Sequence, residues 1–179
     1  MSKKFMFLAA ALVLAGCSQA PEPSNVAGTP IPQSSVSQNA WTVTNLPSTP
    51  LLEYRTSHEI DSQELRKPIV INLWASWCAA CASEMPLIAD SEFAKDVVAI
   101  NVGDLALSSA GKNDAAALVA STHGAFPIYI DTKDALMKAL KINGLPVTFA
   151  VNSSNQIVDY EIGELTNESL KRLVHASKS

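Results

Sequence analysis

Short apolar runs alternate with amphipathic segments along most of the chain. Residues 69–74 and 97–102 are almost continuously apolar and rich in β-branched side chains, which is typical of strands buried on both faces of a sheet. Other strands are expected in apolar runs bounded by turn residues, at 126–130, 147–151 and 157–162. The alternating residues 41–44 predict an edge strand and place the start of the folded domain near Trp41.

Helices are expected in the segments between these strands. Their predicted ranges are 59–66, 79–94 with Pro86 inside it, 109–122, and a segment that runs from a cap at Asp131 or Thr132 to Lys141. A last helix is expected after residue 162, with Thr166 or Asn167 as its N-cap. Because strands and helices alternate and the order closes with a hairpin and a helix, the pattern predicts an α/β fold with a mixed sheet.

The N-terminal segment has the features of an export signal. Two lysines precede an apolar run at residues 5–15, which is shorter than the ~20 residues of a membrane-spanning helix but suits a signal peptide. The run ends in Leu14-Ala15-Gly16-Cys17, which resembles the lipobox of bacterial lipoproteins. The resemblance implies that residues 1–16 are removed and that an acylated Cys17 anchors the chain to the lipid bilayer. An ordinary secretory signal or an uncleaved anchor is the alternative.

Residues 17–40 are expected to form a tether between the lipid and the domain. The segment is rich in Pro, Ser, Gln and Asn and has Glu22 as its only charged side chain, which is typical of a flexible linker. We therefore assign residues 41–179 to one domain that faces the periplasm of a bacterial cell envelope. Ser18 follows the acylated position, and under the sorting rule known for many lipoproteins a residue other than Asp there favours the outer membrane.

Composition and charge narrow the range of partners. The 179 residues include 47% apolar and 17% charged side chains, which fits one globular domain with extensions. The formal net charge of −4 and the lack of a basic run leave no electrostatic footprint for nucleic acid. We therefore expect proteins or thiols as partners, and no nucleic acid.

The sequence Cys78-Ala79-Ala80-Cys81 is the strongest chemical signal. It is expected at the start of a helix that follows a buried strand, where free N–H groups and the helix dipole stabilise a thiolate. Cys78 is therefore the expected nucleophile, and Cys81, one turn deeper, is the residue expected to resolve a mixed disulfide. If Cys17 is acylated, these two are the remaining thiols in a compartment where disulfides persist.

Two other roles of the cysteine pair stay open from the residues alone. Zinc needs four ligands, and besides the cysteines the chain offers only His58, His123 and His175 as soft ligands, without the spacing of a zinc site. A redox-inert disulfide would close a very short loop and gain little from chain entropy. Both fit less well than a redox-active dithiol, and we predict no metal ligand in the site.

Several motifs together resemble the TlpA/ResA-like branch of the thioredoxin superfamily. In chain order they are Asn72 to Cys81, Glu84-Met85-Pro86, Asn101-Val102-Gly103-Asp104, Phe126-Pro127 to Asp131, and Gly144-Leu145-Pro146-Val147-Thr148-Phe149. The likeness covers about residues 65–175. It implies a thioredoxin-like fold with a central mixed sheet, helices on both faces, and an additional helix and strand at about 105–131.

The resemblance also implies roles for single residues. Pro146 matches a cis-proline that lies across from the cysteine pair and leaves the backbone of Leu145 free to pair with a substrate. Glu84 matches a glutamate near the dithiol, and we hypothesise that it shifts the thiol pKa values and transfers a proton. Asn72 stands where plain thioredoxin has a buried acid, which makes Glu84 the nearby candidate for proton transfer. Trp77 is expected to shield the site.

These observations lead to one main hypothesis of function. The chain is expected to be an extracytoplasmic thiol:disulfide interchange protein that reduces disulfides of partner proteins through Cys78 and Cys81, as in cytochrome c maturation or general thiol repair. No small-molecule cofactor is needed, and by family analogy a membrane protein supplies the electrons. The alternative is a copper-binding metallochaperone of the same fold, although such proteins usually separate their cysteines by three residues rather than two.

Overall fold

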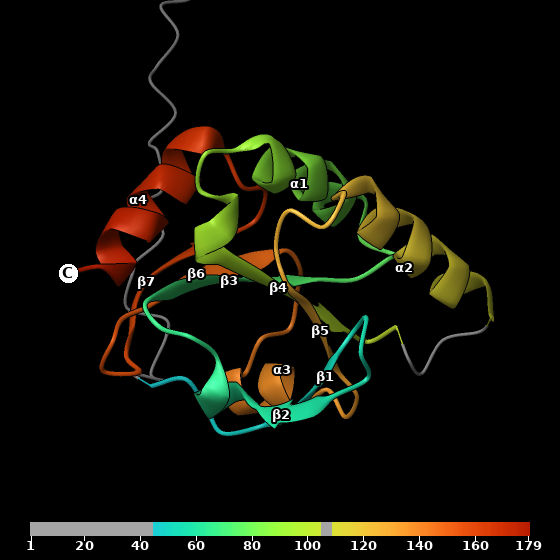
Figure 1. Cartoon of the computed structure of the whole chain (residues 1–179), viewed down its shortest axis with the longest axis horizontal. Helices are drawn as coiled ribbons and strands as arrows, with labels where there is room; N and C mark the ends of the chain where they lie inside the picture. Colours follow the sequence, from blue (N-terminus) through green and yellow to red (C-terminus); the bar gives the residue numbers. More distant parts are fainter. Residues whose placement is uncertain (1–44, 105–108) are drawn as a thin grey trace, which may run out of the picture. The chain divides into compact units, whose positions relative to one another are not determined.

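A mixed sheet lies at the centre of the fold in the computed structural model, which describes residues 45–104 and 109–179 (Figure 1). The strands of the described residues are β1 (Pro50–Glu53), β2 (Glu59–Asp61), β3 (Ile69–Trp74), β4 (Val97–Val102), β5 (Ile128–Asp131), β6 (Val147–Val151) and β7 (Ile157–Ile162). They form one sheet in the order β2-β1-β5-β4-β3-β6-β7. β3 pairs with β4 in parallel and with β6 antiparallel, so the predicted mixed sheet is confirmed.

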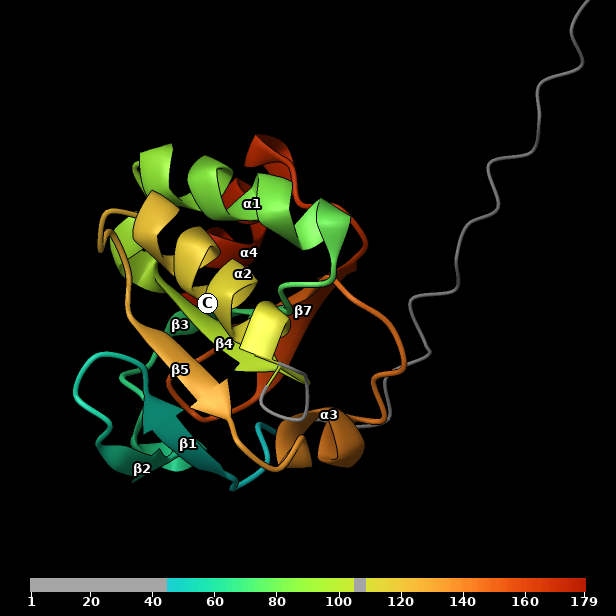
Figure 2. The same cartoon turned by 90° about the vertical axis from the view of Figure 1, so that its right-hand side faces the viewer.

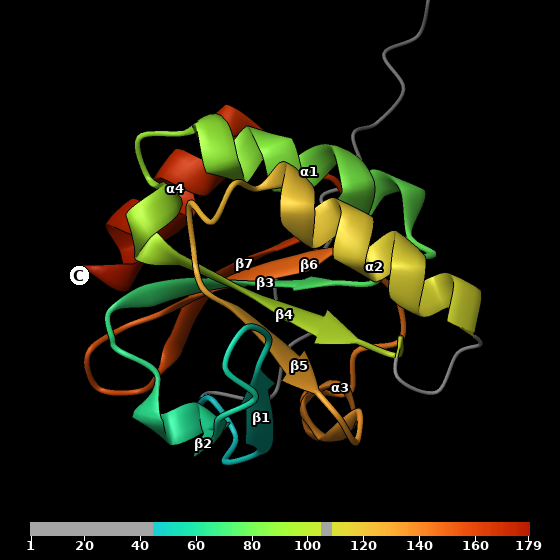
Figure 3. The ribbon, with the colours of Figure 1, turned by 45° about the vertical axis from the view of Figure 1, so that its right-hand side comes forward.

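Helices cover both faces of this sheet. The α-helices of the described residues are α1 (Ala79–Asp90), α2 (Ser109–Ser121), α3 (Ala135–Leu140) and α4 (Asn167–Ser177), and the short 3-10 helices are η1 (Ser62–Glu64) and η2 (Ala94–Asp96). Figures 2 and 3 show α1, α2 and α4 on one face and α3 on the other, as the sequence predicts. Within the described ranges, no helix has the length and apolar character needed to span a membrane.

The central strand β3 is buried from end to end because it has a layer of structure on each side. Val70 and Trp74 pack in the apolar cluster formed with α1, α2 and α4, whereas Ile71 and Leu73 pack in the cluster formed with α3. Burial of each such apolar side chain contributes roughly 1.5–3 kcal/mol. This strand ends at Trp74, and the chain then turns into α1. The two packed layers therefore hold the start of α1 at the carboxyl edge of the sheet.

Two elements near the described N-terminal end differ from the sequence prediction. The helix expected at 59–66 is wrong, because Glu59–Asp61 pairs with β1 as strand β2 and only Ser62–Glu64 forms a turn of helix. The sequence pattern also gave no indication of β1. This strand joins the sheet through β5, where Leu52 pairs with Ile130. Pairing with a strand far along the chain thus overrides the local pattern.

Of the predicted caps of the last two helices, the one of α4 is confirmed and the one of α3 is wrong, because the N-cap residue of α3 is Asp134 rather than Asp131 or Thr132. The carboxylate of Asp131 still accepts the N–H groups of Ala135 at 2.9 Å and Leu136 at 2.7 Å, so it supports the first turn of α3 from outside the helix. Thr166 is the N-cap of α4, as predicted.

Element ends shift by a few residues elsewhere. α1 ends at Asp90 instead of continuing to 94, and β5 begins at Ile128 instead of at 126. The edge strand expected at 41–44, the tether and Cys17 lie outside the described residues.

Candidate active site

Cys78 and Cys81 lie at the amino end of α1, directly after the loop that follows β3. They form a disulfide with an S–S distance of 2.08 Å. Cys78 is the N-cap residue of the helix, and its Sγ accepts a hydrogen bond from the Cys81 N–H at 3.2 Å. Cys78 is 6% exposed and Cys81 is fully buried, so a partner reaches Cys78 first. Because a helix N-terminus stabilises negative charge, this position favours a thiolate at Cys78 in the reduced protein.

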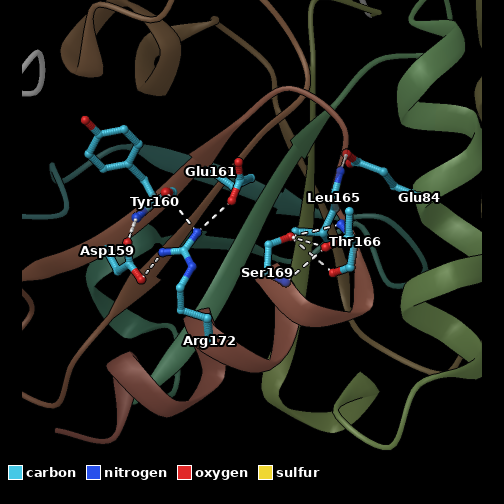
Figure 4. A network of polar contacts seen from close by, with 8 residues as sticks. All are labelled: Glu84, Asp159, Tyr160, Glu161, Leu165, Thr166, Ser169 and Arg172. Atoms are coloured by element: carbon cyan, nitrogen blue, oxygen red, sulfur yellow. Dashed lines mark hydrogen bonds and ion pairs between the residues drawn. The ribbon is translucent and has the colours of Figure 1, made fainter. Parts of the chain in front are cut away.

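Glu84 lies one helical turn after Cys81 and is buried, with 1% exposure. It accepts hydrogen bonds from the Leu165 N–H at 2.6 Å (Figure 4) and from Asn72 Nδ2 at 2.8 Å. Burial raises the pKa of Glu84 to about 7, although both hydrogen bonds act in the opposite direction. Glu84 therefore gains and loses a proton near neutral pH, which suits a group that exchanges protons with thiols.

Asn72 holds Glu84 from the central strand. Besides Glu84, its Nδ2 donates to Thr148 Oγ1 on β6 at 2.9 Å. Its Oδ1 is buried and has no hydrogen-bond partner within the described part of the chain. Because an asparagine amide can turn, this oxygen is available to accept the proton of a neutral Glu84 carboxyl group. The sequence indicated Asn72 and Glu84, but it gave no sign that Thr148 and Leu165 complete their surroundings.

The Leu145–Pro146 peptide bond is cis, as the resemblance implies. Pro146 directly precedes β6, the neighbour of β3, and its carbonyl accepts the N–H of Gly163 at 3.0 Å. Neither the N–H nor the C=O of Leu145 is hydrogen-bonded to another described residue. Its side chain packs, partly buried, against the apolar cluster that contains both cysteines. The backbone of Leu145 is therefore available to an extended peptide.

Trp77 precedes Cys78 and is 59% exposed. Its indole lies beside Gly103, the residue that follows β4. The two are so close that a Cβ placed on Gly103 would be 3.6 Å from the indole Nε1. Gly103 has a φ of +79°, a conformation that side-chain-bearing residues rarely adopt. Trp77 thus lies beside the end of β4 and exposes a large apolar surface next to Cys78.

Asp104 holds the loop in front of the cysteines, a role that sequence reasoning missed. This buried carboxylate accepts hydrogen bonds from Ser76 N–H at 2.8 Å, from Ser76 Oγ at 2.6 Å, and from the side-chain amide of Asn101. The contacts tie the residue two positions before Cys78 to the end of β4. Asp104 belongs to the motif Asn101-Val102-Gly103-Asp104, but its partner Ser76 is 28 positions away, so spacing alone gives no sign of the contact.

We expect Asp104→Ala to lower the free energy of unfolding by about 3 kcal/mol, because the Ser76 N–H and the Asn101 amide would lose their acceptor in a largely buried place. Urea denaturation at neutral pH measures the change. Ser76→Ala removes only the hydroxyl donor and should lower the same quantity by about 1 kcal/mol. An Asp104→Ala protein as stable as the parent would mean that water replaces the carboxylate without cost.

Metal ligands do not gather at this site. Among the described residues, no three or more His, Cys, Asp or Glu side chains are arranged to hold a metal ion. Cys17, the third cysteine of the chain, is not among them.

Comparisons of the sequence find a matching family model and relatives that are named thiol-disulfide oxidoreductases. The Redoxin family model matches residues 27–174. Thiol-disulfide oxidoreductase ResA of Geobacillus kaustophilus is 27% identical over 117 residues, which are 63% of this chain and 64% of that relative, so the chain spans slightly less than two thirds of its length. Sporulation thiol-disulfide oxidoreductase A of Bacillus subtilis is 27% identical over 128 residues, which are 70% of this chain and 78% of that protein.

A comparison of structures supports the fold. The crystal structure of a thio-disulfide isomerase from Thermus thermophilus aligns with a TM-score of 0.60 and 22% sequence identity, and the alignment covers 76% of this chain and 97% of that one. At this identity the likeness shows the fold, and it confirms the thioredoxin-like architecture predicted from the sequence.

Proposed function

We propose that this chain, which belongs to the Redoxin family, is a thiol:disulfide oxidoreductase that cycles between the Cys78–Cys81 disulfide and a dithiol. The observation that carries the proposal is the position of the pair at the amino end of α1, with Cys78 outermost and Cys81 buried behind it. The names of ResA and of the sporulation oxidoreductase support the same chemistry.

The reduced protein transfers two electrons to a client in two exchange steps. The Cys78 thiolate attacks one sulfur of a client disulfide, so that a Cys78–client disulfide forms and the other client sulfur leaves as a thiolate, which takes up a proton. Cys81 then loses its proton and attacks Cys78 Sγ. This step restores the Cys78–Cys81 disulfide and releases the second client sulfur as a thiolate, which takes up a proton. We assign the proton transfer at Cys81 to Glu84, which lies on the same buried side of α1 and titrates near neutral pH.

The surroundings of the disulfide suit an extended protein segment as the client. The unpaired backbone groups of Leu145 would hydrogen-bond to it beside Pro146, and the exposed indole of Trp77 would pack against it. A client bound in this way presents its disulfide to Cys78. This arrangement supports proteins, rather than small thiols, as the natural substrates.

We place this activity outside the cytoplasm, in a bacterial cell envelope. The export signal and the lipobox-like residues ending in Cys17 support an acylated anchor, a periplasmic domain and, through Ser18, the outer membrane. In an oxidising compartment the disulfide has to be reduced again after each client, so a membrane-bound dithiol protein is the proposed electron donor.

The reduction potential of the Cys78–Cys81 pair tests the direction of electron flow. Full-length Cys17→Ser protein, purified in non-ionic detergent, leaves these two as its only cysteines and can be equilibrated in thiol redox buffers. We expect a value near or below about −220 mV, which is the range of reductants such as thioredoxin. A value near −120 mV would instead make the protein an oxidant of exported proteins and would overturn the proposed direction.

A further inference from the structure

Glu164 lies on the loop between β7 and α4, beside the amino-terminal half of α1. The Ser83 hydroxyl has one hydrogen and lies 3.1 Å from Glu164 Oε1 and 2.8 Å from the Ala80 carbonyl oxygen, so these two acceptors share its hydrogen. Ala80 is one of the two residues between Cys78 and Cys81. The Ser83 hydroxyl therefore lies between the Glu164 carboxylate and the backbone of the redox-active segment, within hydrogen-bond distance of both.

The residues on both sides of Glu164 are fixed to the site as well. The N–H of Gly163 donates to the Pro146 carbonyl at 3.0 Å, and the N–H of Leu165 donates to Glu84 at 2.6 Å. The charge of Glu164 is close enough to raise the pKa of Glu84, in addition to the larger effect of burial. The loop thus holds an exposed carboxylate between the Pro146 turn and the cysteine helix.

No cation of the described residues forms an ion pair with this carboxylate. The ion pairs within the described part of the chain are those of Arg172 with Asp159 and Glu161, shown in Figure 4, and that of Lys178 with Asp96. Glu84, the other acid beside Glu164, adds negative charge whenever it is ionised. Among the described residues the Glu164 carboxylate therefore has no cation paired with it, and a cationic side chain of an incoming client can take that place.

We propose that Glu164 selects clients that carry Lys or Arg next to the cysteine under attack, an inference that rests on the proposed function. A client held by the backbone of Leu145 and attacked at Cys78 passes along the Pro146 turn, where Gly163 is bonded and Glu164 follows. A cationic side chain at this point meets an unpaired carboxylate, whereas an anionic one meets repulsion. Because the carboxylate is exposed, the preference is modest and weakens as salt is added.

The experiment uses three short disulfide-linked peptides that are identical except for Lys, Gln or Glu after the cysteine. Reduced full-length Cys17→Ser protein is mixed with each peptide, and second-order rate constants of peptide reduction are measured at low and at high ionic strength. At low salt we expect the Lys peptide to react about threefold to tenfold faster than the Glu peptide, in keeping with one exposed charge pair. In Glu164→Gln this Lys-to-Glu ratio should fall close to one. The rate with the neutral Gln peptide shows any change in the thiol chemistry that Glu164→Gln causes through Glu84, and the Lys-to-Glu ratio shows the loss of the charge.

Glu92→Gln is the matched control, because it removes an equal charge from an exposed position just beyond the other end of α1. It should keep the ratio of the parent protein. A Glu164→Gln protein with the parent ratio, or a ratio that does not fall at high salt, would overturn the proposal. If the parent protein reduces none of the three peptides, the proposed function itself fails and the selectivity fails with it.

Discussion

Replacing Cys78 with serine is expected to lower the rate of disulfide reduction by roughly a thousandfold or more, because a serine hydroxyl does not ionise at neutral pH and cannot form the mixed disulfide. Cys81→Ser should behave differently. Its Cys78 still attacks the client, but no buried thiol follows to expel it, so a covalent client adduct accumulates. Stopped-flow reduction assays measure the first effect, and non-reducing gel electrophoresis detects the second.

Cys17→Ser is the control for both variants, since it removes a cysteine outside the described domain and should leave the rate unchanged. The order of attack would be wrong if Cys78→Ser accumulated the adduct and Cys81→Ser did not. In that case the more exposed sulfur would not be the nucleophile, and the 6% exposure of Cys78 would have to be explained by packing alone.

The fold could be predicted where the chain itself carries a strong pattern. β3 and β4 match the predicted ranges 69–74 and 97–102, because strands covered on both faces are apolar at almost every position. β1 and β2 carry no such pattern, since their outer position in the sheet leaves most of their residues only partly buried or exposed. Their strand conformation comes from pairing with each other and with β5.

Spacing alone predicts only those parts of the site that are close in sequence, whereas Pro146 and the role of Glu84 were implied by the family resemblance. Cys78, Cys81 and Glu84 share a short segment at the start of one helix, so spacing placed them together. The groups that set the protonation of Glu84 come from distant segments: Leu165 is 81 positions away from it, and Thr148 is 76 positions away from Asn72. No local pattern encodes such contacts. They form only when the segment before α4 packs against α1 and when β6 pairs with β3.

The free energy of unfolding of the oxidised protein is expected to fall by about 3 kcal/mol as the pH rises from about 4 to above 7, through Glu84 alone. Glu84 has an ordinary pKa of 4.5 in the unfolded chain and a pKa of about 7 in the folded protein. Between these values the folded protein binds more protons than the unfolded chain, so raising the pH favours unfolding. The contribution is fully present below the lower pKa and is lost above the higher one.

Glu84→Gln should remove this dependence, so its stability relative to the parent protein rises by about 3 kcal/mol across the same range. Glutamine can keep the hydrogen bond from Leu165, and its amide can donate to the unpartnered Oδ1 of Asn72 once that amide turns. Urea denaturation of both oxidised proteins from pH 4 to 8.5 measures the difference, with Glu92→Gln as an exposed-carboxyl control. Parallel profiles for parent and Glu84→Gln would mean that Glu84 titrates normally. It would then be ionised throughout catalysis, and an unchanged rate of thiol exchange in the reduced Glu84→Gln protein would exclude it as the group that takes the Cys81 proton.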